Sequence, residues 1–278
     1  MKLTCVTATF NVIAAGNREH LIRCVESVAR IKIEHEHLIY DGASTDGTVE
    51  LLRDLEARVP GVKVVSERDS GIYNALNKGV RDAKGEWFYV LGSDDYICSA
   101  ETMDKLIADR GSVSCDQIVA PVERDGVRYQ FHRFRDLRIV FRWMPYCHQG
   151  VIMRTDLVRK YHGFDEGYRI CADYDLCFQI HQHAERIRYV FTPFANFAIG
   201  GVCDQNMEAL IDEYNVVLKR HLGLSAAEIV ALRQTNCIPL RVLKRYLFHR
   251  DLALRLAAWW HASSLAKRCM LRVVKRDW

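Results

Sequence analysis

The sequence lacks the features that mark membrane-spanning, secreted and zinc-stapled proteins. No segment approaches the roughly 18 consecutive apolar residues that a bilayer-spanning helix needs. The N-terminus passes from Met1 and Lys2 directly into a strand pattern, without a signal-peptide core. The ten cysteines are scattered and form no CxxC pair, which argues against a zinc site or a disulfide framework. We therefore expect a cytoplasmic protein whose cysteines are small core residues.

Two common nucleotide-binding motifs are absent as well. The chain contains neither GxGxxG, the fingerprint of dinucleotide-binding folds, nor GxxxxGK[ST], the phosphate loop. A bound nucleotide must therefore be held in another way.

The charge is unevenly distributed along the 278 residues. The formal net charge is +4, but residues 241–278 contain ten Lys or Arg against two Asp or Glu. That surplus of eight leaves −4 for residues 1–240. A mildly acidic body suits a protein whose carboxylates hold a metal, whereas a basic terminal segment suits an anionic surface.

Strand and helix patterns alternate along the first hundred residues. Strands are predicted at residues 3–10, 37–40, 62–65 and 87–91, and amphipathic helices after Asn17, after Asp46 and at residues 72–83. Asn17 is expected to cap the first of these helices. This order predicts an α/β fold with a doubly wound, mostly parallel central sheet and flanking helices. Such sheets bind ligands at the carboxyl ends of their strands.

The order of elements changes beyond Asp95. We predict helices near residues 99–110, 172–183, 205–222 and 225–234, strands at 117–120, 150–153 and 187–191, a hairpin at Asp125-Gly126, and a basic amphipathic segment from Pro239. We therefore divide the chain into an α/β domain at residues 1–203, with a boundary between residues 98 and 99, and a helical extension at 204–278.

The residues that follow the first four strands are polar. They are Thr9-Phe10-Asn11, Asp41-Gly42-Ala43-Ser44, Glu67-Arg68-Asp69-Ser70-Gly71 and Gly92-Ser93-Asp94-Asp95. A nucleoside diphosphate sugar needs an acceptor for a base N–H group, a carboxylate for the ribose and a divalent cation for the diphosphate. The side chains of Asp41, Asp94 and Asp95 have the chemistry for these three roles.

These four motifs resemble those of bacterial family 2 glycosyltransferases of the GT-A fold. Three later motifs match in the same order, namely Cys147-His148-Gln149, Gly163-Phe164-Asp165-Glu166 and Ala172-Asp173-Tyr174-Asp175-Leu176. The resemblance covers residues 3 to about 201. It implies a GT-A fold and metal-dependent transfer of a sugar from a nucleoside diphosphate sugar, as in the biosynthesis of bacterial surface polysaccharides. Residues 1–203 would then be the catalytic domain, with a nucleotide-binding half at residues 1–98 and an acceptor-binding half at residues 99–203.

The resemblance also implies roles for individual residues. The nucleotide-sugar-binding set would be Thr9, Asn11, Asp41, Ser44, Asp69 and Asp94. Within it, Asp41 would contact the base and Asp94 the ribose, while Asp95 would bind Mg²⁺ or Mn²⁺. The donor would be a UDP-sugar by default, with a GDP-sugar as the alternative. Ser93 and Leu76 depart from the family pattern, which places an Asp and an Arg there.

Asp173 matches the second residue of the family's Glu-Asp signature, in which Ala172 replaces the Glu. As the catalytic base, Asp173 would deprotonate the hydroxyl of a saccharide or lipid-linked acceptor. A single base without a covalent partner implies inversion at the anomeric carbon. His148 and Gln149 would lie near the acceptor or the diphosphate.

Each assignment has a structural alternative. Carboxylates after a strand also cap the next helix, and carboxylates in a first helical turn, such as Asp173 and Asp175, are favoured by the helix dipole. The departures at Ser93, Leu76 and Ala172 leave open a non-catalytic nucleotide-sugar-binding scaffold. A nucleotidyltransferase is a third hypothesis, although its glycine-rich phosphate loop is missing.

Residues 239–278 have two interpretations. Their leucines, Trp259-Trp260 and arginines suit a helix lying in the anionic headgroup layer at the inner face of the cell membrane. Alternatively, these helices pack on the catalytic domain with their arginines in water. No nucleic-acid partner is expected, because no reading motif accompanies the basic residues. His35, His37, His181 and His183 are expected at the surface, since no carboxylate or cysteine spacing makes them metal ligands.

Overall fold

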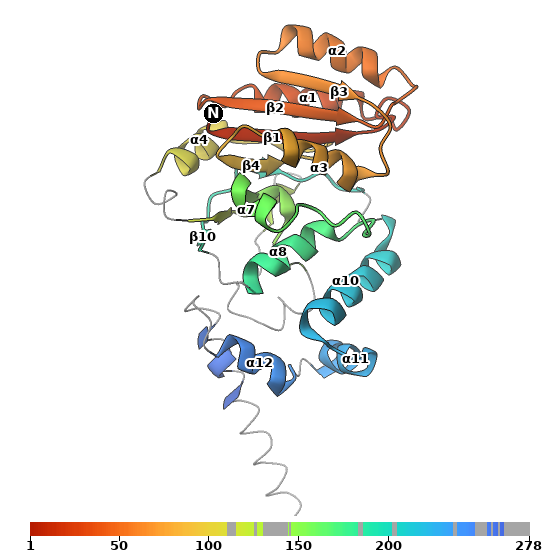
Figure 1. Ribbon diagram of the computed structural model, residues 1–278. Helices are drawn as coiled ribbons and strands as arrows, with labels where there is room; N and C mark the ends of the chain where they lie inside the picture. Colours follow the sequence, from red (N-terminus) through yellow and green to blue (C-terminus); the bar gives the residue numbers. More distant parts are fainter. Residues whose placement is uncertain are drawn as a thin grey trace, which may run out of the picture.

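A central sheet with helices on both faces forms the fold (Figure 1). The computed structural model describes residues 1–109, 115–124, 127–129, 144, 146–182, 186–201, 205–235, 238–247, 255–256, 258–260 and 262–263. The central sheet contains β1 (Leu3–Thr9), β2 (His35–Asp41), β3 (Val62–Ser66), β4 (Trp87–Val90), β6 (Gln117–Val119), β9 (Val151–Arg154) and β10 (Ile187–Tyr189). The helices are α1 (Arg18–Val28), α2 (Thr48–Arg58), α3 (Ile72–Asp82), α4 (Ala100–Ala108), α7 (Thr155–Lys160), α8 (Ala172–Gln182), α10 (Met207–Leu222), α11 (Ala226–Thr235) and α12 (Leu240–Tyr246).

The central sheet is mostly parallel, as the sequence predicts. Its seven strands follow the order β10-β6-β9-β4-β1-β2-β3, and β9 pairs antiparallel with both of its neighbours. The chain runs outward from β1 to β3 and then crosses back to place β4 on the other side of β1. This reversal is a topological switch point, where an open α/β sheet binds ligands.

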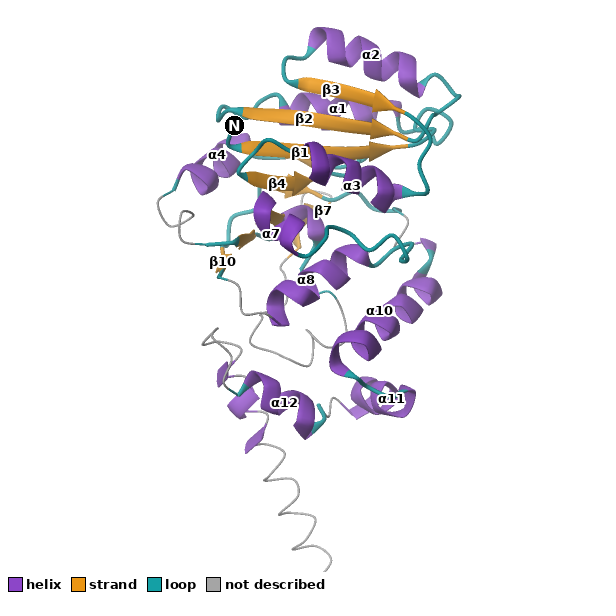
Figure 2. Ribbon diagram, in the orientation of Figure 1, coloured by secondary structure: helices purple, strands orange, loops and turns teal. Residues whose placement is uncertain are grey.

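Apolar side chains bury both faces of the sheet. On one face, α1 and α2 pack on β2 and β3, and α4 extends the same layer beside β4. On the other face, α3, α7 and α8 pack on β1, β2 and β4 (Figure 2). A Cβ atom at Gly79 of α3 would lie 2.5 Å from Val6 Cγ1, so glycine lets this helix approach β1 closely.

A small second sheet was not expected from the sequence. It joins β5 (Tyr96–Ile97), β11 (Ala195–Asn196), β7 (Val122–Arg124) and β8 (Val127–Tyr129) in that order. The antiparallel pairing of β7 with β8 confirms the predicted hairpin, although Asp125-Gly126 itself lies outside the described residues. Helix α7 is also new.

Two local predictions were wrong. His37 is buried, at 1% exposed, because β2 is an interior strand with helices on both faces. Its Nε2 lies 2.9 Å from Thr7 Oγ1, and burial lowers the pKa of the imidazole to about 3. Asn17 precedes α1 but makes no side-chain capping bond, since its Oδ1 contacts His20 instead.

The helices after the central sheet share its core. Side chains of α10, α11 and α12 belong to the same buried cluster as α3, α7 and α8. Val242 and Leu243 of α12 are buried, whereas Leu240, Trp259 and Trp260 are more than half exposed. The described part of the basic segment therefore packs on the body of the protein through Val242, Leu243 and Ala258, and also presents apolar side chains to the outside. Within the described part of the chain, no helix combines the length and apolarity needed to cross a bilayer.

Candidate functional site

Asp41 joins the carboxyl ends of three parallel strands. The strand register places it between Thr9 of β1 and Ser66 of β3. Its Oδ1 accepts hydrogen bonds from the hydroxyls of Ser44 (2.5 Å) and Thr9 (3.2 Å), and its Oδ2 accepts from Ser66 Oγ (2.8 Å) and Ser44 N (2.9 Å). A carboxylate offers about four acceptor sites, so these bonds fill them. The carboxylate is 1% exposed and fixes the strand ends. The predicted contact with the base stays a prediction.

A second set of bonds ties the loop after β1 to the loop after β2. Asn11, with a φ of 46°, donates its N–H to Ser44 Oγ at 2.7 Å, and its Oδ1 accepts from Thr45 N at 3.1 Å. Asp46 Oδ1 accepts from the N–H of Thr48, the first residue of α2, at 3.1 Å. The N-cap position of α2 is Gly47, so Asp46 lies just before it and joins the start of α2 to Ala14 N, from which its Oδ2 accepts at 2.6 Å. Asn11 and Ser44 join the two loops.

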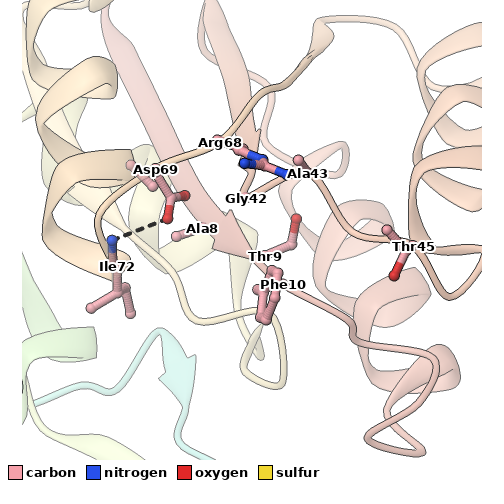
Figure 3. Close-up of a pocket in the computed structure, with 11 residues that line it drawn as sticks. Ala8, Thr9, Phe10, Gly42, Ala43, Thr45, Arg68, Asp69 and Ile72 are labelled. Carbon is pink, nitrogen blue, oxygen red and sulfur yellow. Dashed lines mark hydrogen bonds between the residues drawn. The ribbon is translucent and has the colours of Figure 1, made fainter.

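A cavity of about 620 Å³ lies beside these loops (Figure 3). Its lining residues are Ala8, Thr9, Phe10, Gly42, Ala43, Thr45, Arg68, Asp69, Gly71, Ile72 and Ala75. Phe10 presents an aromatic face that is 65% exposed. A Cβ atom at Gly42 would lie 3.0 Å from Asp69 Oδ2 and 3.2 Å from the Phe10 ring, so glycine lets these side chains approach the loop. Of the predicted nucleotide-binding residues, Thr9 and Asp69 line this cavity.

A second cavity of about 370 Å³ adjoins the first. The two share Ala8 and Ile72. Its other lining residues are Asn17, Leu76, Val90, Leu91, Gly92, Ser93, Asp94, Asp95, Gln149, Phe197, Gly200, Gly201 and Gln205. The structure thus places the predicted residues Asp94, Asp95 and Gln149 next to the first cavity, on the β4 side of the switch point.

Asp94 and Asp95 form an acidic pair on one turn. Asp95 is 1% exposed, its Oδ1 accepts from Ala198 N at 2.8 Å, and the Gln149 amide donates to its carboxylate. Burial and, second, the charge of Asp94 raise the pKa of Asp95 to about 7. Such a pair is stabilised by a cation, and oxygen ligands suit Mg²⁺ or Mn²⁺. The described residues contain no group of three or more His, Cys, Asp or Glu that could hold a metal ion.

Asp173 and His148 lie close to each other. Asp173 is half-buried in the first turn of α8, and burial raises its pKa against the opposing effect of the nearby His148 ring. Burial lowers the pKa of His148. Its ring packs edge-on against Phe164, and its buried Nε2 has no hydrogen-bond partner among the residues described. Neither Asp173 nor His148 lines the two cavities, but Gln149 connects the cavity wall to His148.

The sequence analysis assigned no role to Phe10, Arg68 or Lys78. Arg68 lies at the mouth of the first cavity near Ala43 (Figure 3). The buried ammonium of Lys78 on α3 lies 2.8 Å from Glu67 Oε1 and donates to the Arg68 carbonyl at 3.3 Å. Lys78 thereby holds the loop that carries Arg68 and Asp69. The available signal was that Arg68 is the only basic residue among the four strand-end motifs.

Comparisons with known proteins agree with this geometry. Among the solved structures that are similar to the chain are two complexes with nucleotide sugars. Staphylococcus aureus TarS 1-349 in complex with UDP-GlcNAc has a TM-score of 0.61 at 18% identity, covering 93% of this chain and 89% of that one. The mannosyltransferase PcManGT of Pyrobaculum calidifontis in complex with GDP-Man and Mn²⁺ has a TM-score of 0.56 at 16% identity, covering 99% and 79%. At these identities the likeness concerns the fold, which is GT-A as predicted.

Sequence relatives point the same way. A PGL/p-HBAD biosynthesis glycosyltransferase of Mycobacterium bovis is 30% identical over 175 residues, which is 61% of this chain and 66% of that protein. The chain thus spans just under two thirds of the length of this curated relative. Residues 4–175 match the profile described as Glycosyl transferase family 2. The resemblance predicted from seven motifs is confirmed, and the chain belongs to glycosyl transferase family 2.

Proposed function

We propose that the protein is a metal-dependent, inverting glycosyltransferase that moves a sugar from a nucleoside diphosphate sugar to a saccharide or lipid-linked acceptor in polysaccharide or glycolipid biosynthesis. The main support is one arrangement. A cavity with an exposed aromatic ring and an arginine opens beside a second cavity that holds two adjacent carboxylates, at the switch point of the sheet.

The first cavity suits the nucleoside and its phosphates. The exposed face of Phe10 offers a stacking surface for a base. The Arg68 guanidinium can form paired charge-assisted hydrogen bonds with phosphate oxygens, which compensates for Leu76 at the family's arginine position. Asp94, which lines the adjoining second cavity, would accept hydrogen bonds from the ribose hydroxyls. UDP is the default nucleotide and GDP the alternative, as in the two structural neighbours crystallised with UDP-GlcNAc and GDP-Man.

The second cavity suits the cation and the transferred sugar. Asp95 would hold Mg²⁺ or Mn²⁺ with Asp94 beside it, and the ion would neutralise the diphosphate as it leaves. The Gln149 amide and the Ala198 N–H hold the Asp95 carboxylate from behind, so it is oriented before the ion binds.

Asp173 is the proposed base. Its raised pKa makes the carboxylate a stronger proton acceptor than an ordinary aspartate. The neutral His148 ring beside it has a free buried Nε2 within the described residues, which suits a hydrogen bond to an acceptor hydroxyl. Attack from this side, opposite the diphosphate, inverts the anomeric carbon.

We also propose that the C-terminal segment rests on an anionic membrane at its cytoplasmic face. Leu240, Trp259 and Trp260 are 55%, 55% and 59% exposed, and Arg241 and Lys244 are exposed near Leu240. Exposed tryptophans beside basic residues suit the headgroup layer. Sedimentation with phosphatidylglycerol vesicles tests this surface. The wild-type protein should co-sediment with the vesicles and a W259A/W260A variant should not. Equal co-sedimentation of the two proteins would exclude a role of the tryptophans in membrane binding.

The catalytic proposal is tested in two steps. A thermal-shift screen of UDP, UDP-GlcNAc, GDP and GDP-mannose with and without Mn²⁺ identifies the donor, because a ligand of the folded state raises the melting temperature. Donor turnover is then measured for D95A and D173N, with D54A on the distant α2 as the control. Loss of turnover in both site variants, but not in D54A, supports the proposal. Near wild-type turnover in both site variants would refute it.

A further inference from the structure

Glu213 of α10 binds three consecutive backbone N–H groups. Its Oε1 accepts from Arg169 N at 2.7 Å, and its Oε2 accepts from Ile170 N at 2.9 Å and from Cys171 N at 2.8 Å. Successive N–H groups that converge in this way form an anion-binding concavity, and here a carboxylate of the chain itself fills it. The three residues are the last ones before α8, whose second residue is Asp173.

These bonds fix the backbone that leads into α8. The N–H groups just before a helix have no partner in the helix itself, and a buried N–H without a partner destabilises the fold. One charged acceptor satisfies all three, and charge-assisted bonds are stronger than neutral ones. The start of α8, and with it the Asp173 side chain, is therefore held by a residue about 40 positions further along the chain.

Other contacts from α10 hold the same turn. The Tyr214 ring packs edge-on against Tyr174 with centroids 4.6 Å apart, and His221 Nε2 lies 2.7 Å from Asp175 Oδ1. Figure 1 shows α10 beside α8. Two residues of α10 that follow Glu213 thus contact the two residues that follow Asp173. The His148 ring lies near enough to Asp173 to oppose the rise of its pKa.

We propose that Glu213 is a positioning residue for the base, which sets the place of Asp173 through the backbone at residues 169–171. The inference rests on the proposed role of Asp173. It also gives the helical extension a part in catalysis, because α10 lies outside residues 4–175, the span that matches the family. Glu213 lines neither cavity, and it is bonded to the segment before Asp173 through backbone N–H groups.

The pKa of Asp173 provides a readout that a purely structural role of Glu213 would not change. Burial is the main reason for the raised pKa of Asp173, and the negative charge of Glu213 adds to it. Replacing Glu213 with glutamine removes this charge and turns an N–H donor toward the backbone N–H groups. The lost charge lowers the pKa of Asp173 directly. The weakened backbone contacts also expose Asp173 to more water, which lowers its pKa further.

The test compares E213Q with D212N, which removes an exposed carboxylate from the same helix. Asp173 is titrated by NMR of its labelled carboxyl carbon, with D173N to assign the signal, and amide hydrogen exchange is followed at residues 169–171. We expect E213Q to move the Asp173 titration to lower pH and to speed exchange at these amides by about tenfold, the loss of one charge-assisted bond. D212N should change neither.

Identical titrations and exchange rates in E213Q and D212N would overturn the proposal. The affinity for UDP with Mn²⁺ is measured on the same samples. We expect it to be unchanged in E213Q, which would show a folded protein with an intact nucleotide site. Failure of the wild-type protein to bind UDP or GDP would instead count against the proposed function, and so the two failures are distinguishable.

Discussion

Gly92 leaves the space that the acidic pair needs. A Cβ atom at this position would lie 2.4 Å from Asp95 Oδ2 and 3.0 Å from Asp94 Oδ1, whereas ordinary contacts begin at 3.4 Å. In a G92A variant the Asp95 carboxylate must therefore retreat by about 1 Å. This is about half the length of a Mg–O bond, roughly 2.1 Å, so Asp95 would no longer reach the cation.

We expect G92A to lose the metal-dependent part of nucleotide binding. Displacing the groups that orient a metal ligand typically weakens metal affinity by about 10- to 100-fold. Isothermal titration calorimetry with UDP, in Mn²⁺ and in EDTA, separates this part from the rest. The affinity in EDTA should stay within about threefold of wild type, because Phe10 and Arg68 line the other cavity.

The matched control is G223A. Gly223 ends α10 with a φ of 63°, and a Cβ atom there meets no heavy atom within 4 Å. This variant should lower the free energy of unfolding by about 1 kcal/mol and leave UDP binding unchanged. If G92A bound UDP with wild-type Mn²⁺ dependence, the assignment of the cation to Asp95 would be wrong.

Three further predictions concern other parts of the molecule. D173N should abolish sugar transfer and keep the affinity for UDP, and an unchanged transfer rate in D173N would contradict the role of Asp173 as the base. In the wild-type enzyme, the transfer rate should fall on the acid side at a higher pH than an ordinary aspartate would give, because the pKa of Asp173 is raised. The buried, neutral His37 has a pKa of about 3 instead of 6.5, so the unfolded chain takes up a proton first, and stability falls as the pH drops below about 6.5. Between pH 6.5 and 4, the free energy of unfolding measured with urea should fall less steeply in H37Q than in the wild type, by up to about 1.4 kcal/mol per pH unit. An equal pH dependence in the wild type and H37Q would refute this prediction. K78M should weaken UDP binding by about tenfold, because Arg68 would be displaced. The control K84M, at an exposed lysine just after α3, should not weaken it. Equal effects of the two variants in calorimetry would exclude the positioning role of Lys78.

The sequence predicted the elements of residues 1–98 well because they are long and periodic. The strands β1 to β4 and helices α1 to α3 lie within a few residues of their predicted places. The second sheet escaped detection because β5 and β11 contain two residues each, and Tyr96 pairs with Asn196 far along the chain. His37 was predicted at the surface because of its polar side chain, but helices cover both faces of an interior strand such as β2.

The location of the candidate site followed from the strand ends, but its internal bonding did not. The full set of hydrogen bonds on Asp41 depends on the register that brings Thr9 and Ser66 to its two sides. Glu213 could not be linked to Asp173 from the sequence, because it lies on a helix beyond the family motifs and acts on backbone groups. Pattern analysis finds residues whose type carries the chemistry, while the residues that place them emerge from tertiary contacts.

The most direct measurement is a crystal structure of the protein grown with UDP and MnCl₂, with the ion located by its anomalous scattering. We predict manganese bound to Asp95 and the diphosphate, with the uracil beside Phe10 and Arg68 at the phosphates. Manganese or nucleotide bound away from Asp94 and Asp95 would contradict the account.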